Sequence, residues 1–158
     1  MFRKMLREKQ ALNNDECIEI LKTGLRGVLS VNGDEGYPYG VPINHFYNEA
    51  DGKIYFHSGK KGHKIDAIKE NRKASFCVID GGTENENEWW LTFKSVIVFG
   101  RIEIVEDPET IIEISRLLSL KFTQDEAYIA DEIEKYAKNT FMFALVPEHI
   151  SGKRVNER

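Results

Sequence analysis

The sequence YFHSGKKGHKIDAIKEN, residues 55–71, joins a predicted strand to a predicted helix through a basic turn. The strand begins after the turn signal Asp51-Gly52, and its residues 53–56 are mostly β-branched or aromatic. Asn71 is a plausible end for the helix, and the apolar helix face is formed by Ile65, Ala67 and Ile68. Because the predicted strand and helix are close in sequence, the turn between them must lie where the strand ends and the helix begins.

The turn itself has the composition of an anion-binding site. Ser58, Gly62, His63 and Lys64 surround the predicted helix start, where unpaired N–H groups and partial positive charge favour a phosphate. A solvated Gly/Lys-rich surface turn is the alternative interpretation. The turn is not a nucleotide P-loop, because Gly62 is not followed by Lys-Ser or Lys-Thr. A ligand that carries a single phosphate is therefore expected rather than a triphosphate.

The composition indicates one soluble globular domain over residues 1–158. The net charge of −4 argues against general binding to nucleic acid or to anionic membranes. No apolar run approaches the roughly 18 residues of a membrane span, and residues 1–10 lack the apolar core of a signal peptide. We therefore expect a cytoplasmic protein, in which Cys17 and Cys77 stay reduced.

The segment YPYGVPINHFY, residues 37–47, is an unusual strand. Pro38, Gly40 and Pro42 interrupt it, and proline has no amide to donate to a neighbouring strand. This pattern fits an edge strand or a bulge, where a flat ligand can lie against the backbone. An edge strand that its prolines protect from aggregation is the alternative interpretation.

The remaining segments complete a mainly β (α+β) fold. Six strands are expected, several of them in hairpins, at residues 26–31, 37–47, 53–56, 73–79, 89–107 and 140–146. Helices are expected near residues 13–24, 63–71, 107–121 and 124–137. Because strands and helices do not alternate, these elements predict a six-stranded antiparallel barrel with peripheral helices, whose open edges favour dimerisation.

No complete catalytic or metal-binding motif is present. The histidines at positions 45, 57, 63 and 149 show no zinc-ligand spacing, so no metal is expected. There is also no GxSxG sequence for a nucleophilic serine. A phosphate-binding turn without acid–base residues of its own indicates that a cofactor supplies the chemistry.

Residues 36–78 resemble the FMN-binding split-barrel proteins related to pyridoxamine 5'-phosphate oxidase, especially the branch that includes nitroimidazole-resistance proteins. The pattern VPINHFY…GKIYFHS…GHK carries the resemblance, and SVIVFGRIEIVED (95–107) and ISGKR (150–154) continue it. The resemblance implies a split barrel and a homodimer with FMN in each cleft between the two subunits.

Site residues follow from the same resemblance by position. The strand Val41-Pro42-Ile43-Asn44 would line the isoalloxazine ring with its backbone, and Ser95 would make a hydroxyl contact to the flavin. The ribityl phosphate would be held by His57, Ser58, Gly62, His63 and Lys64. The C-terminal sequence ISGKRVNER has no clear match for the Trp and Arg that hold pyridoxamine phosphate in the true oxidases, so oxidation of vitamin B6 is not expected.

We expect an FMN-dependent oxidoreductase that takes electrons from a donor such as NAD(P)H and reduces a small acceptor, for example a nitroaromatic compound. His45 and His57 are the candidates for proton delivery. The alternative is a non-catalytic carrier or sensor that binds flavin or haem with the same fold.

Overall fold

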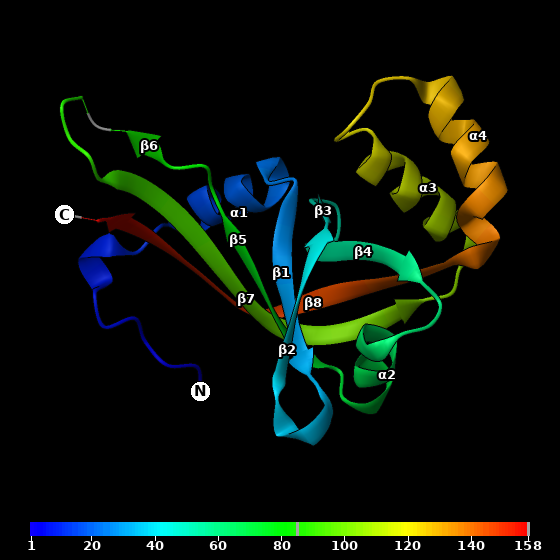
Figure 1. The fold of residues 1–158 in the computed structure, drawn as a ribbon, viewed down its shortest axis with the longest axis horizontal. Coiled ribbons are helices and arrows are strands. Elements are labelled where there is room, and N and C mark those ends of the chain that lie inside the picture. Colours follow the sequence, from blue (N-terminus) through cyan, green and yellow to red (C-terminus); the bar gives the residue numbers. More distant parts are fainter. Residues whose placement is uncertain (85, 158) are drawn as a thin grey trace.

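The computed structural model describes residues 1–84 and 86–157, in which one antiparallel sheet curls into an open barrel (Figure 1). The strand order is β2-β1-β5-β7-β8-β4-β3, and β6 pairs only with β7. The strands are β1 (Arg26–Asn32), β2 (Pro38–Asn44), β3 (Phe46–Asn48), β4 (Lys53–Gly59), β5 (Lys73–Ile79), β6 (Thr83–Glu84), β7 (Leu91–Val105) and β8 (Thr140–Asn156). The predicted mainly β split barrel with peripheral helices is confirmed.

The sheet has two more strands than the six predicted. One arises because the expected strand at residues 37–47 is broken at His45 into β2 and β3. The other is the two-residue strand β6, which pairs with the start of β7. Both additions are short, and neither changes the antiparallel topology.

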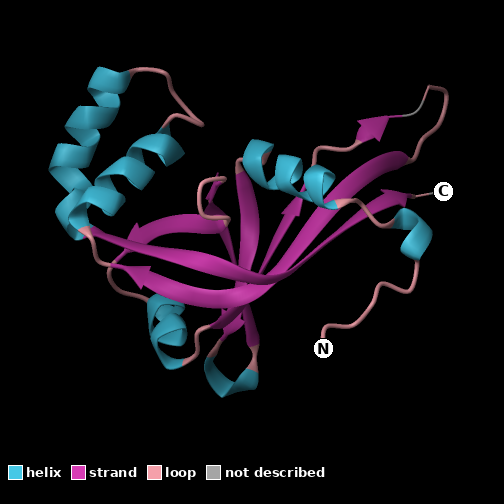
Figure 2. Cartoon of the chain, turned by 180° about the vertical axis from the view of Figure 1, so that it is seen from behind, coloured by secondary structure: helices cyan, strands magenta, loops and turns pink. Residues whose placement is uncertain are grey.

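The helices lie around the outside of the strands (Figure 2). They are α1 (Asn14–Thr23), α2 (His63–Glu70), α3 (Pro108–Ser119) and α4 (Glu126–Tyr136), with short 3-10 turns η1 (Glu8–Gln10), η2 (Asp34–Gly36) and η3 (Ala137–Asn139). Polar side chains cap three of the helices: Asn13 accepts a hydrogen bond from the Glu16 amide, Asp107 from the Thr110 amide and Asp125 from the Tyr128 amide. No helix within these described ranges is both long enough and apolar enough to cross a membrane.

Side chains alternate between the two faces of the sheet, and this alternation separates two hydrophobic clusters. The inner face of the curled sheet forms the main core around fully buried Leu29, Phe56, Phe76 and Phe143, and helices α1 and α2 add side chains to it. On the opposite face, here called the outer face, Tyr55, Met142 and Ala144 pack against Ile114 of α3. The pair α3–α4, inserted between β7 and β8, therefore covers the outer face beside β4 (Figure 1).

The last strand is longer than predicted. Pro147 was expected to end it, yet β8 continues to Asn156 because the β7–β8 register shifts between Phe99 and Gly100, opposite this proline. A Cβ atom at Gly100 would lie 2.2 Å from the Val146 carbonyl oxygen, so only glycine fits the close approach. The bulge lets both strands bend without ending.

Candidate functional site

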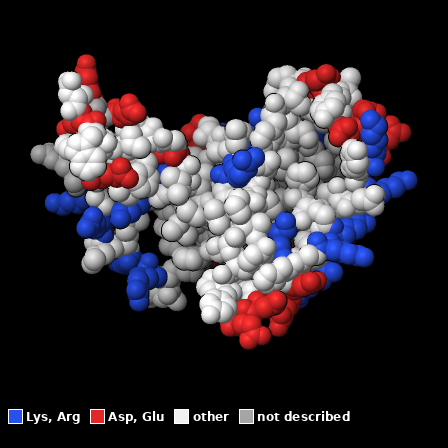
Figure 3. Space-filling model, in the orientation of Figure 1, with Lys and Arg blue, Asp and Glu red and all other residues white. Residues whose placement is uncertain are grey.

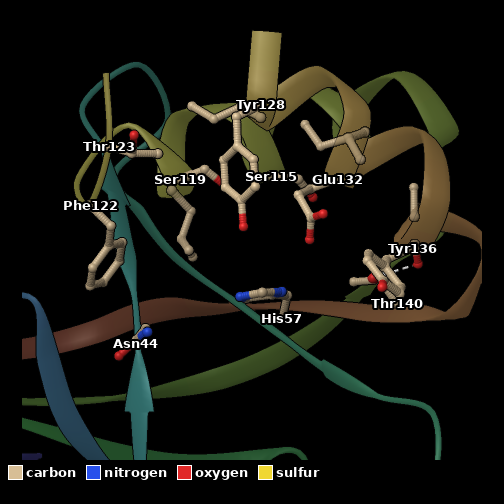
Figure 4. A pocket seen from close by; sticks show the side chains of 14 residues that line it. Asn44, His57, Ser115, Ser119, Phe122, Thr123, Tyr128, Glu132, Tyr136 and Thr140 are labelled. Carbon is tan, nitrogen blue, oxygen red and sulfur yellow. Dashed lines mark hydrogen bonds between the residues drawn. The ribbon is translucent and has the colours of Figure 1, made fainter. Parts of the chain in front are cut away.

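A cavity of about 320 Å³ lies between the α3–α4 pair and the outer face of the sheet. Its floor contains Asn44 at the end of β2 and His57 on β4 (Figure 4). The other lining residues come from α3, α4 and the segments that join them to each other and to β8: Ser115, Leu118, Ser119, Phe122, Thr123, Tyr128, Ile129, Glu132, Ile133, Tyr136, Ala137 and Thr140. The volume is within the usual range for small-molecule sites.

His57 reaches this cavity because of strand alternation. Phe56 is buried in the main core, so the next side chain projects from the outer face, beneath α4 (Figure 4). Partial desolvation in the cavity, together with the positive charge of Lys64, lowers the pKa of His57 below its ordinary value. The imidazole is therefore neutral at pH 7, and it can donate one hydrogen bond and accept another.

The start of α2 lies close enough to His57 for Lys64 to affect its titration. Gly62 precedes the helix with φ of +124°, and no side chain caps the helix there. Desolvation lowers the pKa of the half-buried Lys64 ammonium. This ammonium forms no hydrogen bond or ion pair with the described residues. An uncapped helix start beside a partly buried cation is a favourable environment for an anion.

His63 is already engaged with the hairpin between β1 and β2. Its Nε2 atom accepts a hydrogen bond from the Asp34 amide at 3.3 Å, and its ring stacks on Tyr39 with ring centroids 4.1 Å apart. The exposed turn before it does not line the cavity, and Lys60 donates its ammonium to the Lys138 carbonyl. Unlike His63, the Lys64 side chain has no such partner among the described residues.

The other predicted flavin ligands are spread over the main core, the edge strand β2 and the strands β4 and β7. Ile43 is buried in the main core and Val41 is half-buried, whereas Pro42 is exposed on the edge strand β2. Ser58 donates its hydroxyl to the Gly59 carbonyl. Ser95 on β7 pairs with Ile79 and Lys153 and does not line the cavity. Of the predicted set, the structure brings Asn44 and His57 into one cavity and places Lys64 close enough to His57 to affect its pKa.

His45, the other candidate for proton delivery, lies in the protein interior. It is fully buried, and its Nε2 atom donates to the Leu21 carbonyl at 2.7 Å. Burial lowers its pKa to about 4, and the nearby Lys121 ammonium acts in the same direction. This residue does not line the cavity, and its contacts are those of a structural histidine.

Sequence reasoning missed the residues that α4 contributes to the cavity. Tyr128, Glu132 and Tyr136 recur every four residues and so share one helix face. The periodicity of this helix places its tyrosines with the apolar residues on one side and its acids on the opposite, solvated side. Only the packing of α4 over β4 shows that Glu132 enters the same cavity as the tyrosines.

Known proteins share the sequence pattern and the fold of this chain. The family model described as pyridoxamine 5'-phosphate oxidase matches residues 13–154. A candidate 5-nitroimidazole antibiotic resistance protein from Bacteroides thetaiotaomicron aligns with TM-score 0.76 and 19% identity, covering 92% of this chain and 87% of that chain. A search of curated proteins found no match.

Two mycobacterial structures have the same fold. A conserved hypothetical protein from Mycobacterium tuberculosis aligns with TM-score 0.79 and 19% identity, covering 95% of this chain and 90% of that chain. An FAD-binding protein from Mycobacterium smegmatis aligns with TM-score 0.68 and 21% identity, covering 94% of this chain and 99% of that chain.

The position of His45 predicts a loss of stability in acid. Its pKa is about 4 in the folded protein and near 6.5 in the unfolded chain, so the unfolded chain binds the proton first as the pH falls. The free energy of unfolding should therefore fall between pH 6.5 and pH 4, by roughly 3 kcal/mol from this residue. Urea unfolding at pH 7 and pH 4 measures the change.

Replacing the histidine separates its contribution from that of the other groups. His45→Gln should reduce the difference between the two pH values, whereas His149→Gln, on the outer sheet face, should leave it as in the unaltered protein. If His45→Gln loses as much stability in acid as the unaltered chain, this explanation is wrong.

Proposed function

The chain belongs to the pyridoxamine 5'-phosphate oxidase family, and from this premise we propose that it is an FMN-dependent oxidoreductase that reduces small acceptors, such as nitroaromatic compounds. The observation that supports the proposal most directly is the cavity whose floor holds Asn44 and His57 and which lies near the uncapped start of α2. In this proposal the planar ring would occupy the cavity and the anionic tail would lie at the helix start.

The residues of this chain fit a flavin phosphate in charge and in position. The α2 amides have no side-chain cap, and the half-buried Lys64 ammonium would gain an anionic partner. A charge-assisted hydrogen bond of this kind contributes about 1.5–3 kcal/mol. A Cβ atom built at Gly62 would have no neighbouring atom within 4 Å, which leaves room for a phosphate oxygen beside the backbone.

Asn44 and His57 would contact the ring. Arg26 donates its Nε–H to the Asn44 side chain at 2.8 Å, which fixes the amide at the end of β2. When bound, FMN accepts a hydride or two electrons and passes them on. The neutral imidazole of His57 faces the same space and is our candidate for moving a proton between the cavity and the acceptor.

We also propose that the protein is a homodimer with a flavin at each subunit interface. The outer face of the sheet beyond α3–α4 exposes apolar side chains on neighbouring strands. Val28, Cys77 and Ile97 are in register across β1, β5 and β7. The most exposed apolar residues of this region are Val28 (41%), Ile79 (61%), Ile97 (40%) and Phe99 (42%). A continuous apolar sheet face of this kind favours association with a second copy.

Reductase activity can be separated from simple flavin binding by anaerobic mixing. Protein loaded with FMN should lose its flavin absorbance when NADH or NADPH is added, and 4-nitrobenzyl alcohol should restore the absorbance. A flavin that remains oxidised for minutes would indicate a carrier instead. Protein that stays colourless after mixing with FMN would contradict flavin binding, and chromatography of the released cofactor distinguishes FMN from FAD.

The phosphate contact predicts a selective effect of Lys64→Met. The Kd for FMN should rise at least about tenfold because one charge-assisted bond is lost. The Kd for riboflavin, which has no phosphate, should change less than about twofold. Lys61→Met removes an exposed charge from the same turn and serves as the control. Flavin fluorescence titration measures all these Kd values. An equal rise in the Kd for FMN and for riboflavin would mean that Lys64 does not contact the phosphate.

The dimer proposal predicts that a charge on the apolar sheet face separates the subunits. Ile97→Glu should halve the mass measured by light scattering and should reduce flavin retention, because each site would lose residues from the partner. Ile112→Glu makes the same change at an exposed position on α3 and should remain dimeric. An unaltered protein that is monomeric at micromolar concentration would overturn this part of the proposal.

A further inference from the structure

The roof of the cavity carries one carboxylate. Glu132 is the only acidic side chain among the described residues that line the cavity, and none of those residues is a lysine or an arginine. Figure 4 shows the Glu132 carboxylate and the Tyr128 hydroxyl pointing from α4 into the space above His57. A bound molecule between roof and floor would therefore meet a carboxylate that accepts hydrogen bonds.

The cation paired with this carboxylate among the described residues lies closer to another acid. The nearest ammonium in the ion pairs found is that of Lys135, 4.0 Å from a Glu132 oxygen, and it lies closer to Asp131, at 2.5 Å. On the floor, His57 is neutral at pH 7 for the reasons given above. The Glu132 side chain is 38% exposed, so part of its charge is screened by water and the rest acts on the contents of the cavity.

Aromatic rings line the same cavity as the carboxylate. Phe122, Tyr128 and Tyr136 all line the cavity, and the two tyrosines lie four residues before and after Glu132 on α4. The faces of aromatic rings attract cations, most strongly where water is partly excluded. Rings combined with one carboxylate form the chemical environment that recognises an organic cation.

The wider charge distribution acts in the same direction. Helix α4 carries Glu126, Asp131, Glu132 and Glu134 against the single cation Lys135. Figure 3 shows acidic residues over this end of the molecule with some basic residues beside them, and other acidic residues elsewhere on the same face. A negative potential at the roof attracts cationic molecules and repels anions.

We propose that Glu132 determines the specificity of the cavity, selecting small aromatic acceptors that carry a protonated amine or another N–H donor. This inference rests on the proposed function, since it assigns the floor to the flavin ring and the roof to the second substrate. The amine would donate to the Glu132 carboxylate while its ring lies among Phe122, Tyr128 and Tyr136. Phosphorylated or carboxylated acceptors are disfavoured at the same place.

Three nitroaromatic probes of nearly equal shape test the inference. At neutral pH, 4-nitrobenzylamine is a cation, 4-nitrobenzyl alcohol is neutral and 4-nitrobenzoate is an anion. Isothermal titration calorimetry of the FMN-mixed protein should give a Kd for the amine about tenfold lower than for the alcohol, with the benzoate weakest. In steady-state reduction with NAD(P)H, the same order should appear in KM rather than in kcat.

Matched variants locate the preference. Glu132→Gln should bring the ratio of amine to alcohol KM close to one, and Glu132→Asp, which keeps the charge, should retain part of the preference. Glu134→Gln removes the same group from an exposed position on α4 that does not line the cavity, and it should keep the original ratio within about twofold.

The role of Glu132 and the proposed reductase activity can be refuted separately. Equal binding of all three probes, or a Glu132→Gln variant that keeps the original ratio, would overturn the role of Glu132 even if the flavin turns over normally. Absence of any flavin reduction would overturn the reductase proposal, while the calorimetric order of the three probes would still decide whether the cavity selects cations.

Discussion

The two-residue period of β4 is the constraint on which the rest of the structure depends. Phe56 enters the main core and His57 projects from the outer face, so one strand serves both the core and the cavity. A register slip of one residue would exchange the two side chains, burying an imidazole and exposing a phenyl ring. The pairing of Phe56 with Phe143 and of His57 with Met142 on β8 prevents that slip.

The roof of the cavity depends on a separate set of contacts. Lys121, just after α3, donates its ammonium to the Gly24 carbonyl at 2.6 Å and to the His45 carbonyl at 2.7 Å. These bonds join the helical insertion to the junction of β2 and β3, next to Asn44 on the cavity floor. Burial lowers the pKa of Lys121 to about 8, so the ammonium is still mostly protonated at pH 7. Roof and floor are therefore held together by a charged group that is satisfied by backbone oxygens.

Local patterns in the sequence predict the elements well, and tertiary packing decides the rest. The turn before Lys53 and the apolar spacing after Gly62 predict β4 and α2 because both signals are short-range. The extension of β8 past Pro147 needs the bulge opposite it, which no local pattern reveals. His45 resembles a catalytic candidate by type and position, but only the course of the chain shows that it turns into the core. Periodicity alone places Glu132 on the solvated side of its helix, because it cannot say which surface the helix covers.

The opposite charges at the two ends of the site limit the orientation of any ligand. Lys64 and the uncapped start of α2 favour an anionic group on one side, while Glu132 disfavours it at the roof. A flavin with one phosphate satisfies both conditions only if its tail lies at α2, which leaves its ring near Asn44 and His57. A second molecule must then enter below α4, where a phosphate would find a carboxylate and no cation among the described lining residues. The charge arrangement that would orient the proposed cofactor therefore also disfavours a phosphorylated substrate, so phosphorylated vitamers are poor candidates for the acceptor.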